Sequence, residues 1–161
     1  MSALNTAGVR YLVTGGLAVV AHGHLRFTAD VDLILDLREE NVRLAIAALE
    51  QLGYRPRAPV PFRDFANAAK RSEWAREKGL SVFSLFSDEH PATEVDLFVD
   101  PPLDFDVAYR AAARLEVAPG IEAVFVAYDD LLRLKTRGGR PVDLEDIARL
   151  KAIREKDHDG E

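Results

Sequence analysis

The sequence predicts an α+β domain, in which a mixed sheet is flanked by helices and followed by a helical C-terminus. Short apolar runs of strand length alternate with segments whose apolar residues recur at helical spacing. After residue 126 only helical patterns remain. With 48% apolar residues, a chain of 161 residues can bury one substantial core. We expect a single domain over 1–161, with a sheet-containing part over 1–126 and a helical part over 127–161.

Composition excludes several classes of protein. The chain has no cysteine, so disulfides and thiolate metal sites are excluded. No run of about 18 apolar residues predicts a membrane-spanning helix. No basic segment followed by an apolar stretch marks a signal peptide at the N-terminus, so we expect a cytoplasmic protein without a membrane partner. A net charge of −6 argues against general coating of nucleic acid.

Charge is distributed unevenly along the chain. Residues 88–106 hold seven acidic residues and no Lys or Arg, whereas residues 131–156 hold eight basic and four acidic residues. An acidic region beside a basic one suits a metal site that faces a phosphate-binding rim. The alternative for the basic residues is an ordinary solvated helix.

The first part of the chain alternates strands and helices. Val42, Ala45, Ile46 and Leu49 recur at helical spacing, and Gly53 ends that helix. Asp36 is the expected N-cap of this helix, by the preference of helix starts for Asp. We expect at most one helical turn in 2–8, strands over 9–14 and 29–35, helices over 17–22 and 36–52, and a short strand plus loop over 54–61.

The second part continues the pattern and ends in helices. Asp104 is a candidate N-cap, as is either Asp129 or Asp130, and Gly138-Gly139 interrupts the helical pattern before Pro141. We expect one or two short helices in 62–78, strands over 80–86, 94–99, 113–117 and 123–126, helices over 104–111, 129–135 and 143–155, and frayed residues over 156–161.

Asp30 and Asp32 form the chemical centre of the sequence. In the strand Ala-Asp-Val-Asp-Leu-Ile-Leu the two aspartates share one face, with Cα atoms about 6.6 Å apart, and the apolar residues share the other. Carboxylates this close repel each other, and a cation relieves the repulsion. Hard oxygen ligands favour Mg²⁺ or Mn²⁺.

The pair Gly15-Gly16 and a third carboxylate complete this pattern. Two glycines between a strand and a helix permit a tight turn and the close approach of a phosphate to the helix N-terminus. A two-metal site needs a further carboxylate to position or deprotonate an attacking hydroxyl. Asp96 is the best candidate because it lies in a strand between apolar residues, and Glu94 on the same face is its competitor.

These motifs resemble the nucleotidyltransferase superfamily, which includes DNA polymerase β and the CCA-adding enzymes. That pattern is Gly-Gly or Gly-Ser after an apolar residue, roughly a dozen residues, Asp-x-Asp, and a later carboxylate on a strand. Here thirteen residues separate Gly16 from Asp30. The resemblance implies a nucleotidyltransferase-like fold and metal binding by Asp30, Asp32 and Asp96.

A second resemblance extends to the C-terminus and is to bacterial nucleotidyltransferase-like proteins related to the AbiEii toxins. It is carried by Arg-x-Thr-x-Asp-x-Asp and by a downstream Leu-x-x-Leu-Lys…Gly-Arg-Pro-x-Asp-x-x-Asp. In this chain the matching residues are Arg26, Thr28, Asp30, Asp32, Leu131, Leu134, Lys135, Gly139, Arg140, Pro141, Asp143 and Asp146. It implies that Lys135 lies near nucleotide phosphates and that Asp143 or Asp146 is required for catalysis.

Together the resemblances imply a Mg²⁺-dependent (or Mn²⁺-dependent) enzyme that moves an NMP from an NTP to a hydroxyl of an RNA, such as a tRNA, or of a protein. A role in a toxin–antitoxin or phage-defence system would add a cognate antitoxin or toxin as a partner. This chain is shorter than the large toxins and lacks their extra helical domain. The alternative is an inactive module of the same fold that binds a nucleotide or a partner.

Several candidate residues have a simpler structural interpretation. We assign nucleotide binding to Gly15, Gly16, Arg26, Thr28, Lys135 and Arg140, and catalysis to Asp30, Asp32, Asp96, Lys135, Asp143 and Asp146. Thr28 can instead order its loop, Arg140 can pair with Asp143 or Asp146, and Asp143 can cap a helix. We expect His22 and His24 to be structural or exposed rather than metal ligands.

Overall fold

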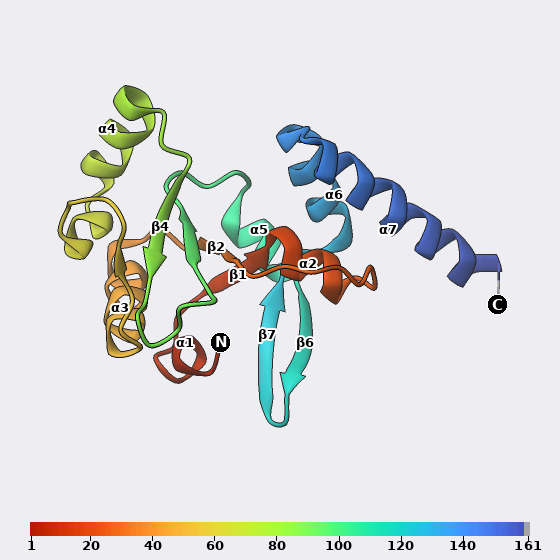
Figure 1. The fold of residues 1–161 in the computed structure, drawn as a ribbon, viewed down its shortest axis with the longest axis horizontal. Helices are drawn as coiled ribbons and strands as arrows, with labels where there is room; N and C mark the ends of the chain where they lie inside the picture. The colour runs from red at the N-terminus through yellow and green to blue at the C-terminus, as the bar shows by residue number, and fades with distance from the viewer. Residues whose placement is uncertain (160–161) are drawn as a thin grey trace.

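A single mixed sheet of seven strands forms the centre of the computed structural model, which describes residues 1–159 (Figure 1). The strand order is β3-β4-β5-β2-β1-β7-β6. Strands β1 and β7 pair in parallel, as do β2 and β5, and the other neighbours are antiparallel. The bounds are Tyr11–Thr14 (β1), Val31–Leu35 (β2), Arg55–Pro56 (β3), Val82–Phe86 (β4), Val95–Phe98 (β5), Ala113–Ala118 (β6) and Ile121–Phe125 (β7).

Helices lie at both ends of this sheet. Figure 1 shows α3 and α4 at the β3–β4 end, α6 and α7 side by side at the other end, and the β6–β7 hairpin projecting away from the body. The bounds are Ser2–Thr6 (α1), Gly15–Ala21 (α2), Glu39–Gln51 (α3), Phe62–Ala66 (the 3₁₀ helix η1), Ala68–Lys78 (α4), Phe105–Ala111 (α5), Tyr128–Gly138 (α6) and Pro141–Asp159 (α7). The expected α+β fold with a helical C-terminus is confirmed.

An aromatic cluster fills the core beneath β4. The Phe83 ring packs between those of Trp74 and Phe65, at centroid distances of 5.3 and 5.1 Å. Because side chains alternate along a strand, Phe83 points to the helical side while Ser84 points to the opposite face. The core side of the sheet is closed by α3, η1 and α4, and the face that carries Ser84 stays partly open.

The expected cap of α3 is wrong, because this helix begins two residues later than Asp36 permits. Arg38 is the N-cap residue, and the Asp36 carboxylate accepts hydrogen bonds from the backbone N–H and the guanidinium of Arg38. Asp36 is only 5% exposed and also accepts from Arg10 Nη1 at 2.7 Å. A buried carboxylate needs charged partners. Because the Asp36 carboxylate binds these two arginines, it does not cap the helix.

Other helix starts also differ from expectation. Ala127 is the N-cap residue of α6, so Asp129 and Asp130 lie inside the first turn, where a negative charge still favours the helix dipole. Helix α2 begins at Gly15 directly after β1, rather than at residue 17. The expected cap of α5 is correct, since Asp104 accepts from the Val107 N–H at 3.0 Å.

The last helix is longer at both ends than expected. Pro141 occupies its first position, where a missing N–H costs nothing. It continues through Asp159, so the expected fraying is wrong for 156–159, and residues 160–161 lie outside the described residues. Of the helices seen in the described chain, none combines the length and the apolar character that crossing a bilayer requires.

Phe83→Ala tests the aromatic core. Removing a ring that is 2% exposed leaves a cavity between Trp74 and Phe65, so we expect the free energy of unfolding to fall by about 3–5 kcal/mol. Urea unfolding followed by tryptophan fluorescence measures it. Val107→Ala is the control, because a side chain that is 55% exposed should change stability by less than about 0.5 kcal/mol. Equal losses in the two variants would contradict this packing.

Candidate functional site

The site is built on a row of four residues that crosses the open face of the sheet. In the strand register Thr14 lies beside Asp32, Asp32 beside Asp96, and Asp96 beside Ser84. Register neighbours on adjacent strands are about 4.8 Å apart and share a face. Asp32 and Asp96 are therefore neighbours, although they are far apart in sequence. Asp30 lies one residue before β2 and is exposed.

Negative charge is concentrated at these carboxylates. Burial raises the pKa of Asp32, and the negative charges of Asp96 and Asp30 raise it further. The positive charges of Lys135 and Arg140 lower the pKa of Asp32 in part, so both cations lie within electrostatic range of the row. Asp96 Oδ1 is buried and has no hydrogen-bond partner in the described chain. An unpartnered buried carboxylate oxygen is costly unless a ligand completes it.

This set of donors fits a hard divalent cation that a substrate helps to hold. Asp32 and Asp96 offer adjacent carboxylates, and one buried oxygen of Asp96 is free to accept. Among the side chains of residues 1–156, no three His, Asp or Glu already converge into a metal cage. Mg²⁺ usually binds one or two carboxylates and takes its other ligands from water and substrate phosphates. The residues therefore fit Mg²⁺ better than a cation that needs an all-protein cage.

Gly15 and Gly16 are necessary because other side chains occupy the space beside them. Gly15 has φ +63°, and a Cβ there would lie 1.9 Å from Asp32 Oδ2. A Cβ on Gly16 would lie 2.3 Å from Thr28 Oγ1 and 3.0 Å from Arg26 Nη2. The glycine turn thus sits directly against the Asp32 carboxylate and the loop before β2.

A buried ion cluster forms the opposite wall of the site. Lys135 Nζ on α6 lies 2.9 Å from Asp143 Oδ1 and 2.8 Å from Asp146 Oδ2, both on α7. The bond to Asp143 is a well-aligned hydrogen bond, whereas Asp146 Oδ2 makes a charge contact without that alignment. All three side chains are at most 4% exposed. Arg26 Nε contacts Asp146 Oδ1 at 3.0 Å, so the cluster also holds the loop before β2.

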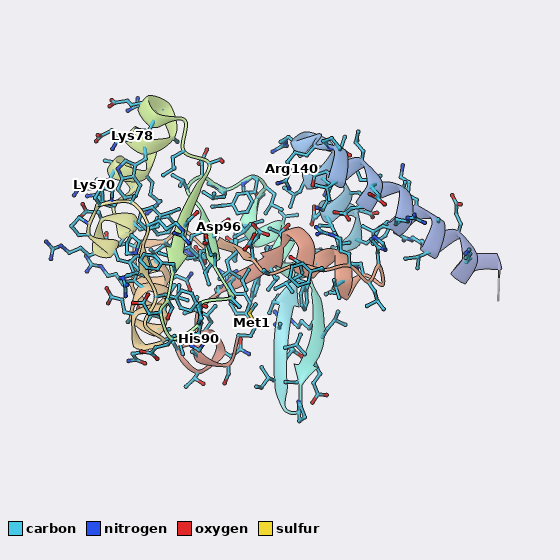
Figure 2. The ribbon with its side chains drawn as sticks, in the orientation of Figure 1. Met1, Lys70, Lys78, His90, Asp96 and Arg140 are labelled. Atoms are coloured by element: carbon cyan, nitrogen blue, oxygen red, sulfur yellow. The ribbon has the colours of Figure 1, made fainter. Side chains whose placement is uncertain are left out.

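Arg140 extends this cluster to the surface. Its Nε lies 2.8 Å from Asp143 Oδ2, and its backbone N–H donates to the same oxygen, as in a helix-capping box. Burial by itself raises the pKa of Asp143, but hydrogen bonds from Arg140 and Lys135 outweigh it and lower the pKa to about 2. Figure 2 shows Arg140 at the start of α7 and Asp96 on β5, in the middle of the molecule.

The structure gathers most of the predicted residues around this site. The carboxylate row contains Asp32 and Asp96, the glycine turn lies against it, and the C-terminal residues form the ion cluster. The charge of Lys135 is already matched by two aspartates, which the sequence pattern did not indicate. Asp143 is not the N-cap of α7, because this helix begins at Pro141, but its carboxylate accepts from the Arg140 N–H at the helix start and from Lys135 in the cluster.

Glu94 is engaged elsewhere. The Arg57 guanidinium hydrogen-bonds the Glu94 carboxylate, with Nε at 3.1 Å from Oε2, and this hydrogen bond lowers the pKa of Glu94. The hydrogen bond to Glu94 raises the pKa of Arg57, and the charge of Asp96 adds a smaller increase. Arg57 and Ser84 are neighbours of the site that sequence reasoning missed. A lone arginine between prolines carries no signal, and alternation alone does not reveal which strand lies beside β5.

His22 connects two elements of the fold. His22 Nε2 donates to the carbonyl oxygen of Val126 at 2.8 Å, and its ring packs edge-on against Tyr128 at 5.9 Å. These contacts join the end of α2 to the start of α6, which is a structural role. No cluster of metal-binding side chains includes His22 or His24 in the part of the chain that the structure describes.

Of the comparisons with known proteins, only the one with solved structures found a match, and this match concerns the fold. No family model matches the sequence, and no curated protein matches it. Among solved structures, the lincosamide antibiotic adenylyltransferase LnuA in its lincomycin-bound form superposes with a TM-score of 0.59 at 18% identity. The match covers 93% of this chain and 90% of LnuA. At this identity the likeness shows that this chain shares the fold of LnuA.

Asp143→Asn tests the ion cluster through pH. A pKa lowered from 3.8 to about 2 means that ionised Asp143 stabilises the fold by roughly 2 kcal/mol at neutral pH. That contribution is present above pH 3.8 and is lost as pH falls toward 2. We therefore expect the variant to be less stable than the parent at pH 7, with the difference shrinking below pH 4 in urea unfolding.

Glu145→Gln is the matched control on the same helix. The Glu145 side chain is 66% exposed and its nearest cation, Arg149, is 3.9 Å away. An exposed pair at this distance contributes little, so this variant should unfold like the parent at every pH. A pH-independent loss in Asp143→Asn would contradict the assigned role of its charge.

Proposed function

We propose that this protein is a Mg²⁺-dependent nucleotidyltransferase that moves an NMP from an NTP to an acceptor hydroxyl. One observation carries the proposal. Asp32 and Asp96 lie side by side on a half-open face, Asp96 keeps an unpartnered buried oxygen, and the cations Lys135 and Arg140 are within range. Carboxylates facing basic groups are the arrangement that an NTP with its divalent cation requires.

Each element of the site receives a role in this proposal. Asp30 and Asp32 would hold Mg²⁺, with Asp96 as the third carboxylate. When bound, the cation would neutralise the charge of the phosphates. The turn at Gly15-Gly16 and the side chains of Arg26, Thr28 and Arg140 would orient the phosphates. The sheet part, 1–126, would thus supply the carboxylates, and the helical part, 127–161, would supply the basic rim.

The proposed reaction is an in-line displacement at the α-phosphorus. The acceptor oxygen forms a bond to that phosphorus as the bond to the β-phosphate oxygen breaks, and pyrophosphate leaves. In this proposal Asp96 would take the proton of the attacking hydroxyl, and the absence of a hydrogen-bond partner for its Oδ1 in the described chain supports this role. Most of the rate enhancement in such a reaction comes from positioning and charge stabilisation.

Lys135 favours a second candidate, an inactive module that binds a nucleotide or a partner. Its ammonium is 4% exposed and already faces two carboxylates, so it contributes little net positive charge to a phosphate. Asp32 nevertheless senses this charge, which supports a role of Lys135 in balancing the site. NTP binding without transfer to any acceptor would distinguish this module from the enzyme.

The acceptor is proposed to be a hydroxyl of RNA, such as tRNA, or of a protein. LnuA, whose structure contains lincomycin, makes a small-molecule hydroxyl the third class to test. Each of the four labelled NTPs should be incubated with total RNA, with cell protein and with lincomycin. A role as a toxin, implied by the AbiEii-like motifs, predicts growth arrest on expression that a neighbouring partner gene relieves. A role as an antitoxin predicts that this chain relieves the arrest caused by that partner.

Asp30→Ala combined with Asp32→Ala should abolish nucleotide transfer and Mg²⁺-dependent NTP binding. Asp32 lies on the open face of the sheet, and Asp30 is exposed just before β2, so the fold should survive. Circular dichroism with thermal unfolding checks this. Removing Asp32 also removes a carboxylate whose ionisation burial disfavours, so stability at pH 7 should not fall. Unchanged nucleotide transfer by the double variant would contradict the proposal.

Asp96→Asn and Glu94→Gln separate the two candidates for the third carboxylate. If Asp96 takes the proton of the attacking hydroxyl, Asp96→Asn should lower kcat by at least about a hundredfold. Glu94→Gln should keep kcat within about threefold, because Glu94 is bound to Arg57. Initial rates at saturating NTP give both values. The reverse pattern would reassign the role to Glu94.

A further inference from the structure

The outer edge of the sheet at β6 is open, unlike the edge at β3. Strand β3 has two residues, includes Pro56, and is followed by a loop with two further prolines. Such edges resist pairing with another chain. Strand β6, Ala113–Ala118, has six residues and no proline. It pairs only with β7 within the described sheet, and Figure 1 shows this hairpin standing away from the body.

The side chains of β6 are exposed on both of its faces. Leu115 and Val117 are 38% and 50% exposed, which is unusual for apolar residues in a strand. On the other face Glu116 lies directly opposite Glu122 of β7. Like charges in this position destabilise a sheet. Arg114 Nη1 is 3.5 Å from Glu122 Oε1, whereas Glu116 Oε1 accepts from the Gly120 N–H and makes no ion pair with side chains of residues 1–156.

We propose that a second copy of this chain pairs with β6 in antiparallel fashion, with Leu115 opposite Leu115 of the second copy. In this register Arg114 lies opposite Glu116 of the second copy, and Glu116 lies opposite Arg114 of the second copy. Opposed residues of an antiparallel pair share a face. The two ion pairs therefore form on one face, and Ala113, Leu115 and Val117 of both copies meet on the other.

The charge order of β6 identifies the occupant as the same chain. Arg114 and Glu116 flank Leu115 symmetrically, so the strand is complementary to itself when it is reversed about that residue. The pairing supplies the cation that Glu116 lacks and offsets its repulsion from Glu122. It also covers Leu115 and satisfies the free backbone groups of the edge. A local irregularity of the β6–β7 ladder between Glu116 and Ala118 includes Val117, so the pairing centres on the regular residues 114–116.

Charge exchange at this register provides the test. Glu116→Arg places Arg opposite Arg114 of the second copy, and Arg114→Glu places Glu opposite Glu116. Each single variant should raise the dissociation constant of the dimer by roughly tenfold or more, because two attractive pairs become repulsive. The double variant R114E/E116R should restore the parent value. An equimolar mixture of the two single variants should also dimerise, since each then meets its complement.

Sedimentation velocity over a range of micromolar concentrations measures these equilibria. The parent should approach twice its chain mass of 17.8 kDa as concentration rises. Glu50→Arg, the same charge change on an exposed position of α3, is the control and should dimerise like the parent. Salt should weaken the ion pairs and therefore shift the parent toward monomer.

A cysteine cross-link tests the register separately. The chain has no cysteine, so Leu115→Cys introduces a single thiol. Opposed Cα atoms in an antiparallel pair lie about 4.5–5.5 Å apart, which suits a disulfide. Mild oxidation should cross-link most of this variant. Val117→Cys should cross-link far less, because that residue faces Ala113 of the second copy.

Three outcomes would overturn the proposal. A chain that remains monomeric throughout the concentration range has no self-pairing edge, whatever other strand it binds. A dimer that is indifferent to both charge reversals uses another surface. Cross-linking of Val117→Cys in preference to Leu115→Cys would refute the register. None of these measurements involves nucleotide transfer, so they stand apart from the proposed activity.

Discussion

The parallel pairing of β2 with β5 is the constraint on which the candidate site depends. It places Asp32 beside Asp96, although α3, η1, α4 and β4 separate them along the chain. The same pairing sends Leu33 and Leu97 into the core on the other face. A slip by one residue would bury the carboxylates and expose the leucines. Apolar packing thus specifies the position of the acidic groups, and the energy of the core maintains the site.

The ion cluster around Lys135 performs the corresponding task for the opposite wall. Buried charges contribute little net stability, but removing one partner leaves another uncompensated, so such a cluster permits few alternative arrangements. Here it joins α6, α7 and the loop before β2 through Lys135, Asp146 and Arg26. The consequence is that two positive charges are held within range of Asp32, while most of the charge of Lys135 is balanced internally.

The two open surfaces of the molecule have a common origin in the placement of its helices. The helices α3, η1 and α4 cover the side of the sheet that carries Phe83, which leaves the side with Asp96 and Ser84 accessible. None of them reaches β6, which ends the sheet as an edge strand paired on one side only within the described residues. The first surface carries carboxylates beside basic groups, an arrangement that suits an anionic substrate with its cation. The second is self-complementary and suits another copy of the chain.

Sequence alone determined the seven strands and the helical C-terminus, because alternation and helical spacing are properties of short segments. The candidate site residues came from motif spacing and from the resemblance to nucleotidyltransferases rather than from period. The starts of four helices, α2, α3, α6 and α7, were misplaced. For α3 the reason is tertiary, because Arg10 and Arg38 bind the Asp36 carboxylate that would otherwise cap the helix. Only tertiary structure decided that Asp96 is the register neighbour of Asp32, that Glu94 is bound to Arg57 and that Lys135 is enclosed. Period fixes which face a residue occupies, whereas strand order and helix packing decide which distant residue lies across from it.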